Sequence, residues 1–544
     1  MADDPALGSL HVEDATPPTP TQQKRGVRFW GTIVCLCLLS FLSALDVTVI
    51  TTALPTITDD IGGARQYVWI ANSFVVASSV MQPLFGQLAN IFGRRTPLVA
   101  SVAAFTLGST LAGSARGAGL LIAGRTTQGI GAGGMYVLLD IVCCDLVPLR
   151  DRGTYMGLIF ACAGVAAALG PPVGGALAAA NWRWIFYMNL PFCGLVLAGL
   201  LFFMQVRSGA VQAKELSVMA KIGRIDIVGS LIFTPSMIAL LFGLIEGGNR
   251  YPWSSWRVLL PLLLGAVGWI CFHAQQFFVS NRTSATAFLL TFTSAMLVQS
   301  LSYFLPVYFQ AVKGATALES GKLFLPFAIG SLVFAVVAGT LLSKFGRYKP
   351  LHAVAFILSS VAFGLLTMLN ANTAKVASVW FELIAAAGMG MIMSVLLPAI
   401  MAPLPESYVA SSSATYGFVR NFGNIWGVTI PSLVFNSVID RNLPNISDPA
   451  LRSHLRGGGA YAFASQAHTL RHTIDPAVWS EVVGVYVTSF EAIWRVCLGI
   501  SLFSLCAVAL ERSVEMRKEL DTEYGLEKKD DVVEELSPSH REKS

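Results

Sequence analysis

The stretch GQLANIFGRRTPL, residues 86–98, sets Gly93, Arg94 and Arg95 directly between two long apolar runs. A related stretch, GTLLSKFGRYKPL, fills residues 339–351 and agrees with the first at seven of thirteen positions, all at one offset of 253 residues. The agreeing pairs are Gly86/Gly339, Leu88/Leu341, Phe92/Phe345, Gly93/Gly346, Arg94/Arg347, Pro97/Pro350 and Leu98/Leu351. Such a repeat predicts a chain made of two related halves with the same orientation.

Composition places the chain in a membrane. Of its 544 residues, 54% are hydrophobic and only 13% are charged, whereas soluble domains carry about 25% charged residues. A large soluble enzyme is therefore excluded, and an all-α polytopic membrane protein is expected. A spanning helix needs roughly 20 apolar residues. We expect fourteen such helices, at residues 30–54, 67–88, 98–115, 120–143, 155–179, 185–206, 226–247, 256–279, 286–311, 320–342, 351–369, 377–402, 410–438 and 489–510.

The repeat also predicts the domain organisation. Eight expected helices lie between the two arginine loops, whereas six would separate them in a protein of two simple six-helix bundles. We therefore expect an N-terminal bundle over residues 30–206, a linker with two additional transmembrane helices over 207–285, and a C-terminal bundle over 286–510. Residues 1–29 and 511–544 are the predicted tails. Their polar parts, residues 1–27 and 513–544, are expected to be disordered because they cannot bury enough apolar surface to fold.

Basic residues favour one orientation. Arg94, Arg95, Arg150, Arg152 and the cluster Lys344, Arg347 and Lys349 fall in loops on one side, which the positive-inside rule assigns to the cytoplasm together with both termini. The long loop at 439–488 then faces outward. It holds Asn445-Ile446-Ser447, a predicted glycosylation site, whereas the similar sequon at Asn281 faces the cytoplasm.

Several motifs follow the arginine loop in a characteristic order. They are LDVTVITTALP (45–55), RTTQGIGAGG (125–134), DLVPLRDRGTYMG (145–157), GPPVGG (170–175) and ATYGFVRNFGNIWG (414–427). With the loop at 86–95, these stretches resemble the major facilitator superfamily and, within it, the fourteen-helix fungal drug:proton antiporters. The resemblance covers nearly all of residues 30–510. It implies the major facilitator fold, two six-helix bundles plus two extra helices.

The resemblance also implies roles for particular residues. The helix-four arginine, here Arg125, is associated with proton coupling in that family. The family's antiporter motif, which marks exporters, matches Gly170, Pro171, Pro172, Gly174 and Gly175. Its conformational-switch loop matches Gly86, Asn90, Gly93, Arg94 and Arg95, with Gly339, Gly346 and Arg347 in the second copy. The chain departs from the family at Asn90, where an acidic residue is usual, so Arg94 and Arg95 are expected to bind lipid phosphates, a helix C-terminus or acids such as Asp145 and Asp151.

Charges inside the predicted helices are the other candidate site residues, because a charge at a helix centre costs roughly 2.5–3.5 kcal/mol on insertion scales. Asp46 lies nine residues before Pro55, where the first helix is expected to end. We interpret it as a protonatable group beside a cation, either Arg125 or Arg420; the alternative is a static ion pair between the first and fourth helices. Arg420 must face a cavity or a carboxylate. Asp140 is a further candidate for binding the substrate or a proton, and a purely structural role is the alternative. Glu246 and Glu382 lie near outer helix ends and are expected to reach water.

The predicted function is a proton-coupled secondary transporter that exports hydrophobic small molecules, drugs, toxins or fungal secondary metabolites, by alternating access. The alternatives are an importer or vacuolar transporter of the same fold, for basic amino acids or iron chelates, and a membrane sensor that does not transport. No GxxxxGK[ST] stretch is present, and the nine cysteines have no metal-ligand spacing. We therefore expect no enzyme activity, no metal, no cofactor beyond the proton gradient and no nucleic-acid partner. A monomer in the plasma membrane is expected, with the vacuolar membrane as the alternative.

Overall fold

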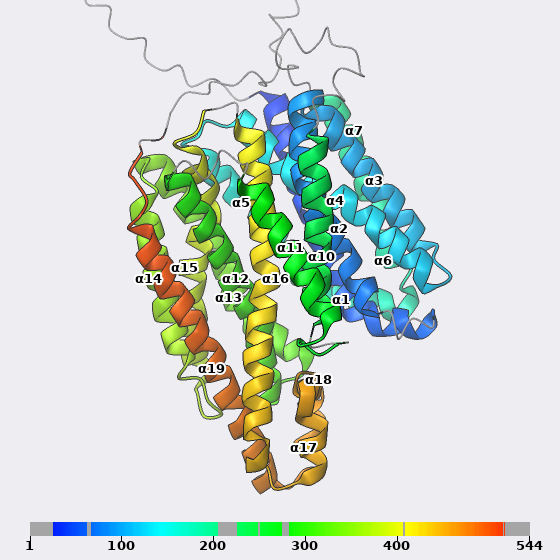
Figure 1. The fold of residues 1–544 in the computed structure, drawn as a ribbon, viewed down its shortest axis with the longest axis vertical. Helices are drawn as coiled ribbons and strands as arrows, with labels where there is room; N and C mark the ends of the chain where they lie inside the picture. The colour runs from blue at the N-terminus through cyan, green and yellow to red at the C-terminus, as the bar shows by residue number, and fades with distance from the viewer. Residues whose placement is uncertain are drawn as a thin grey trace, which may run out of the picture.

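The protein is a bundle of long helices (Figure 1). The computed structural model describes residues 26–61, 67–204, 226–247, 251–274, 282–405, 408–514 and 516. Within these ranges every regular element is a helix, and the only β pairing is an isolated bridge between Gly247 and Tyr251. The predicted all-α class is confirmed. Most of the tails at 1–29 and 511–544, and the linker residues 207–225, lie outside the described residues.

The N-terminal half consists of α1 (Val27–Asp60), α2 (Tyr67–Phe92), α3 (Arg95–Gly113), α4 (Ala118–Leu146), α5 (Arg152–Asn181), α6 (Trp184–Tyr187) and α7 (Asn189–Phe203). The short α6 and the longer α7 together form one apolar span, Trp184–Phe203. Within this half α1 packs on α5, and α4 packs between α2 and α3.

The C-terminal half consists of α12 (Arg282–Ala311), α13 (Ala317–Phe345), α14 (Lys349–Leu366), α15 (Lys375–Met401), α16 (Val409–Asn442) and α19 (Pro476–Val508). Its pairing follows that of the first half, because α15 packs between α13 and α14 as α4 does between α2 and α3. The connection between α16 and α19 holds η3 (Leu443–Asn445), α17 (Pro449–Leu455), η4 (Arg456–Gly458) and α18 (Gly459–Leu470).

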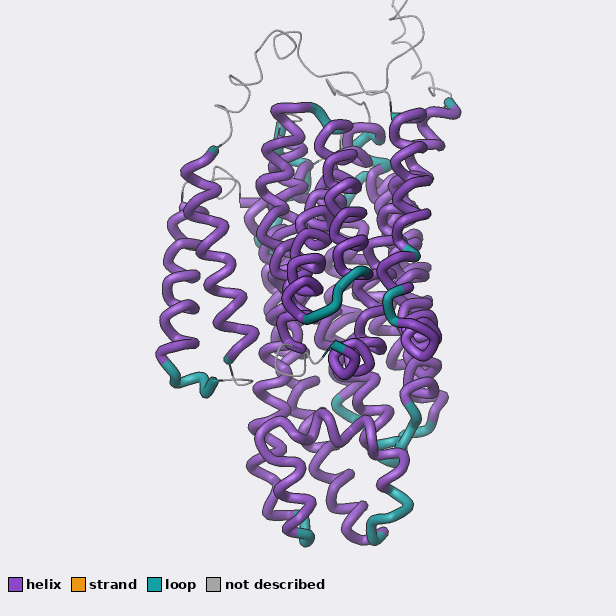
Figure 2. The backbone as a smooth tube through the Cα atoms, turned by 90° about the vertical axis from the view of Figure 1, so that its right-hand side faces the viewer, coloured by secondary structure: helices purple, strands orange, loops and turns teal. Residues whose placement is uncertain are grey.

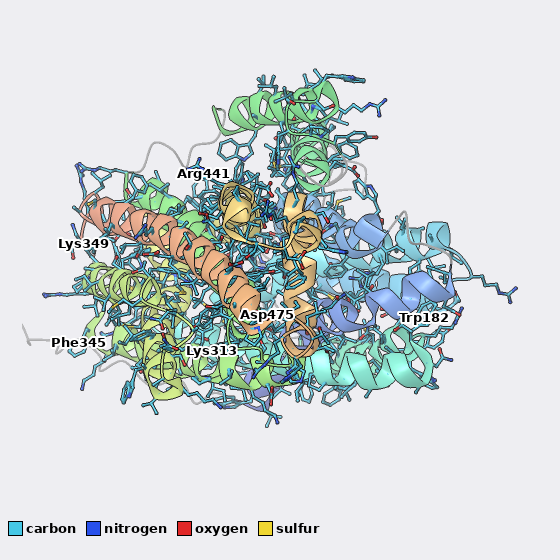
Figure 3. All side chains as sticks on the ribbon, turned by 90° about the horizontal axis from the view of Figure 1, so that it is seen from below. Trp182, Lys313, Phe345, Lys349, Arg441 and Asp475 are labelled. Carbon is cyan, nitrogen blue, oxygen red and sulfur yellow. The ribbon has the colours of Figure 1, made fainter. Side chains whose placement is uncertain are left out.

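A hairpin of α10 (Ile227–Glu246) and α11 (Trp256–Ala274) forms the predicted insertion between the halves. Figures 2 and 3 show these helices as a separate pair beside the main body. Twelve described helical segments are long and apolar enough to cross a membrane. The apolar stretches described in α10 and α11, Val228–Leu244 and Trp256–Trp269, are shorter, so the predicted total of fourteen spanning helices stays a prediction.

Several helices extend beyond their predicted ends. The first helix continues through Pro55 to Asp60 and begins at Val27, inside the predicted tail. The last begins at Pro476 rather than 489, and much of the predicted loop 439–488 is helical. The predictions were wrong at these ends because they followed the apolar runs, whereas helical hydrogen bonding continues into polar sequence once the helix has formed.

The predicted C-terminal tail is anchored at its beginning. The buried His352 side chain meets both carboxylate oxygens of Glu511 at 3.0 Å, and the Tyr348 hydroxyl donates a hydrogen bond to the Arg512 carbonyl. The Arg512 amide in turn donates to the Thr283 hydroxyl at 3.2 Å. Polar groups at the starts of α12 and α14 therefore hold residues 511 and 512, where the predicted tail begins.

The two halves meet through small residues near one end of the bundle, the end that carries Gly93 and Gly346, which we call the arginine-loop face. It lies at the top of Figure 1. A Cβ added to Gly86 of α2 would lie 2.5 Å from the Ala414 Cβ of α16, and one added to Gly339 of α13 would overlap the Gly153 carbonyl of α5. Small residues permit such close approach of transmembrane helices. The halves are therefore closed against each other at the arginine-loop face.

Candidate functional site

Asp46 lies at the centre of a buried polar network in the N-terminal half. Its Oδ2 accepts a hydrogen bond from Arg125 Nη1 at 2.6 Å, and the exposed fractions of the two side chains are 0% and 1%. Its Oδ1 accepts from the Gln128 amide at 2.6 Å and from the Asn189 amide at 2.8 Å. Both carboxylate oxygens are thus held by donors from α4 and α7, as a buried charge requires.

The sequence of α4 accounts for this arrangement. Arg125 and Gln128 are three residues apart and therefore share one face of the helix. A Cβ added to Gly108 of α3 would overlap the Gln128 backbone, and one added to Gly124 would lie 2.6 Å from the Ala112 amide nitrogen. These glycines let α3 and α4 approach closely and exclude water. The Arg125 guanidinium also lies over the Phe74 ring, 4.4 Å from its centroid.

Of the two cations predicted as partners of Asp46, the structure selects Arg125. Arg420 belongs to a different group. The sequence prediction did not identify Gln128, Asn189 or the Ser109 hydroxyl, to which Gln128 donates at 3.0 Å. Gln128 could have been predicted from the sequence, because it lies three residues after Arg125 and so shares its helix face. Asn189 could not, because it belongs to a distant helix and no sequence pattern connects it to Asp46.

Arg420 lies where the halves meet. It projects from α16 over the rings of Tyr416, at 5.1 Å, and of Phe160 of α5, at 5.3 Å. Asp140 of α4 interacts with it electrostatically, yet no hydrogen bond reaches Asp140 Oδ2. The two charges, one from each half, are close without forming a salt bridge.

Gln82 of α2 extends this inter-half group. The side chain is fully buried, and neither its amide nitrogen nor its amide oxygen has a hydrogen-bond partner among the described residues. A Cβ added to Gly417 of α16 would lie 2.9 Å from the Gln82 amide oxygen. Tyr136 of α4 also interacts electrostatically with Arg420. We call Gln82, Tyr136, Asp140, Phe160, Tyr416 and Arg420 the inter-half cluster. It combines aromatic walls with a few polar groups, which is the composition of small-molecule sites.

The arginine loop has the contacts expected from its departure at Asn90. The backbone of Gly93 and Gly346 adopts the left-handed conformation, with φ of 79° and 66°, which favours glycine. Arg94 Nε donates to Asp145 at 2.7 Å, and its Nη1 donates to the Ala89 carbonyl and, at 3.2 Å, to Asn90. Arg95 donates to the Leu201 carbonyl in the last turn of α7. The predicted Asp145 and helix C-terminus partners are therefore both present.

Other contacts of this face differ from the prediction. Gly86 of α2 faces Ala414 of α16 in the other half. Asp151 accepts from the Ser343 hydroxyl, and Arg150 donates to the carbonyls of Ser343 and Lys344 at the end of α13. These contacts again connect the two halves. Arg347 is exposed, and no ion pair joins it to any residue in the described ranges.

The GPPVGG stretch lies inside α5. A Cβ added to Gly170 would overlap the hydroxyl of Thr48, which follows Asp46 by two residues in α1. The absence of a side chain at Gly170 therefore lets α5 pack closely on α1 near Asp46. Gly174 is buried, Pro172 and Gly175 are exposed, and the Pro171 side chain lies outside the described residues.

Two acids predicted to reach water do not. Glu246 and Glu382 are 2% and 1% exposed. Glu246 accepts a hydrogen bond from the Trp69 indole at 3.0 Å, and this hydrogen bond connects α10 to α2. Asn445 is exposed at the end opposite the arginine-loop face and donates to the Asn442 side chain.

The chain matches known proteins over most of its length. The family model described as Major Facilitator Superfamily matches residues 36–428. The chain is 41% identical over 532 residues to the MFS efflux transporter aclA of Aspergillus oryzae, covering 95% of each chain. It is 42% identical over 542 residues to the MFS-type transporter gkaD of Penicillium citrinum, covering 97% of this chain and 92% of that protein. An MFS-type transporter of the acurin A biosynthesis cluster of Aspergillus aculeatus is 37% identical over 539 residues, covering 97% and 96%.

Solved structures share the architecture. The human organic anion transporter MFSD10 has a TM-score of 0.53 and 16% identity, covering 88% of this chain and 99% of that chain. The proton:xylose symporter XylE has a TM-score of 0.52 and 16% identity, covering 81% and 94%. At this identity the likeness concerns the fold alone.

Proposed function

Because the chain belongs to the major facilitator superfamily, we propose that it exports hydrophobic small molecules, such as drugs, toxins or fungal secondary metabolites, in exchange for protons. The names of its relatives, efflux transporters and a transporter of a biosynthesis cluster, support export. The observation that carries the proton exchange is the Asp46 carboxylate, enclosed in the N-terminal half with Arg125 as its counter-ion.

Protonation of Asp46 is the proposed coupling step. A proton on Asp46 would cancel its attraction to Arg125 and leave the guanidinium buried without a counter-ion, which is costly. We propose that the N-terminal half then changes its conformation to give Arg125 a new partner. This change would drive the alternation between the outward-open and inward-open states. A site that binds the proton in one state and releases it in the other converts the proton gradient into transport.

The substrate site is proposed at the inter-half cluster. Phe160, Tyr136 and Tyr416 provide apolar surface for a hydrophobic ligand, and Arg420, Gln82 and Asp140 provide the few polar groups that orient it. Since the halves close at the arginine-loop face, the described state is open to the opposite side on this proposal. In Figure 1 the helices of the N-terminal half tilt away from the C-terminal half toward that lower end.

The direction of flux tests the proposal. The purified full-length protein is reconstituted in sealed vesicles, a pH gradient is imposed, and the uptake of a panel of hydrophobic compounds is measured. Movement of a compound against the proton flow supports an exporter, whereas movement with it supports the importer. No flux of any compound, together with equal growth of cells with and without the gene on toxic compounds, would favour the sensor.

The proposed location is the plasma membrane, with both termini and the arginine-loop face in the cytoplasm and Asn445 outside. Glycosidase treatment of the natively expressed protein should shift its gel mobility, and Asn445→Gln should remove the shift. Asn281→Gln is the matched control, because that sequon is expected on the cytoplasmic side. A shift that persists in Asn445→Gln and disappears in Asn281→Gln would invert the orientation. A monomer remains the proposed state.

A further inference from the structure

The carboxyl group of Glu382 is buried in the C-terminal half, and no cation among the described residues forms an ion pair with it. The side chain is 1% exposed. Its Oε2 accepts a hydrogen bond from the Phe327 backbone amide at 3.4 Å, and its Oε1 has no hydrogen-bond partner among the described residues. Asp46, a buried acid of the N-terminal half, has three side-chain donors. The two acids therefore differ in what stabilises a negative charge.

Neighbouring helices bring no compensating charge to Glu382. Helix α15 packs against α5, α12, α13, α14 and α16. The charged side chains of these helices and of α15 itself are Arg152, Arg282, Glu319, Lys322, Lys344, Lys349, His352, Lys375, Arg420, Asp440 and Arg441. Within the described part of the chain, the environment of the Glu382 carboxyl group consists of its burial and the hydrogen bond from the Phe327 amide. An ionised carboxylate in this position would be an unpaired charge inside the membrane, which proteins avoid.

Glu382 also links two helices of the C-terminal half, α15 and α13. It lies seven residues into α15, about 10 Å from the end opposite the arginine-loop face. Its partner Phe327 belongs to α13, which meets α5 of the other half at Gly339 and Gly153. One turn further along, a Cβ added to Gly330 of α13 would lie 2.9 Å from the Ala386 Cβ of α15. A movement of α13 against α15 would therefore change the surroundings of this carboxyl group.

We propose that Glu382 is a second proton-binding site, located in the C-terminal half and occupied by a proton in the described state. The inference rests on the proposed exchange of substrate for protons. The proton comes from the aqueous side opposite the arginine-loop face and bonds to Oε1, which gives a neutral carboxylic acid while Oε2 keeps the Phe327 amide. When α13 moves and the arginine-loop side opens, the O–H bond breaks and the proton leaves to that side. No other reactant is needed.

The protonation state can be measured without a substrate. Glu382→Gln keeps the size of the side chain and a carbonyl oxygen for the Phe327 amide, so the variant should fold. Infrared difference spectra of the purified full-length protein across a pH titration should show the carbonyl stretch of a protonated acid in the wild type, and this band should be missing from Glu382→Gln. Glu246→Gln, which changes a buried acid of the α10–α11 hairpin, should retain it. An identical acid band in the wild type and Glu382→Gln would overturn the proposal.

Transport gives the second readout. Rhodamine 6G, or the panel compound that the wild type exports best, is accumulated in vesicles at a fixed pH gradient. If Glu382→Gln exchanges one proton fewer per substrate, the accumulation ratio should fall about tenfold for each pH unit of the gradient. Glu246→Gln should match the wild type. An unchanged ratio in Glu382→Gln would exclude Glu382 from the exchange. If the wild type itself shows no proton-driven flux, the proposed function fails, and the infrared result still decides whether Glu382 holds a proton.

Discussion

Asp46 on α1 and Arg125 on α4 are joined by an ion pair of 2.6 Å, from Oδ2 to Nη1, in which neither side chain is more than 1% exposed. The pair lies wholly inside the N-terminal half, whereas Asp140 and Arg420 belong to different halves and interact electrostatically without a salt bridge. The first pair is the proposed proton site, and the second group, between the halves, is the proposed ligand site.

Asp46→Asn is expected to abolish pH-driven transport while the protein remains folded and inserted. Asparagine retains hydrogen bonding to Gln128 and Asn189 but cannot gain or lose a proton. The loss of the counter-ion of Arg125 should still lower stability, since removing one partner of a buried ion pair costs about 3–5 kcal/mol. Flux in proteoliposomes and thermal unfolding in detergent measure the two effects. Wild-type coupling in this variant would remove Asp46 from the mechanism.

Asn90→Asp should strengthen closure of the arginine-loop face and shift the protein toward the state open on the opposite side. Arg94 already donates to Asn90 at 3.2 Å, and a carboxylate in place of the amide would turn this hydrogen bond into an ion pair with the guanidinium. Distances between spin labels at the ends of the two halves, measured in lipid, report the balance of states. An unchanged distance distribution would leave the loop a role in topology and packing only.

Gly339→Ala should favour the opposite shift and reduce transport several-fold. An alanine Cβ at this position would overlap the Gly153 carbonyl, so the halves could no longer close fully at the arginine-loop face. Gly364→Ala on α14 is the matched control, because a Cβ there meets nothing within 4 Å. The same spin-label distances and flux assay apply. Equal transport by the two variants would show that the Gly339 contact does not limit closure.

Asp60→Asn should weaken the acid dependence of stability. Asp60 accepts hydrogen bonds from the Trp182 indole at 2.8 Å and from Arg183 at 3.2 Å, and these lower the pKa of its carboxyl group in the native state. A lowered native pKa adds stability above the pKa of the unfolded carboxyl, about 3.9, and this stability is lost as the pH falls through the native value. Thermal unfolding at neutral pH and below about pH 4 should show a larger acid loss for the wild type. Parallel losses in the two proteins would contradict the assignment.

The sequence predicted the architecture more accurately than the side-chain partners. The repeat of the arginine loop at an offset of 253 residues predicted two related halves, and the halves show the same helix pairing. The helix ends were less predictable, as α1 shows, because polar sequence after Pro55 remains helical. Glu246 and Glu382 were misplaced for a related reason: a position near the end of a helix does not reveal whether neighbouring helices cover it.

By itself the sequence determined that this is a membrane protein of two related helical halves, because apolar runs of membrane length and the repeated loop are local properties of the chain. It also supplied the buried charges Asp46, Arg125, Asp140 and Arg420. Only the tertiary structure decided which of them pair: Asn189 and Arg125 reach Asp46 from helices 143 and 79 residues away. Pairing inside a bundle depends on the rotation and closeness of helices, which residues such as Gly108 and Gly124 set through packing and which no single helix specifies.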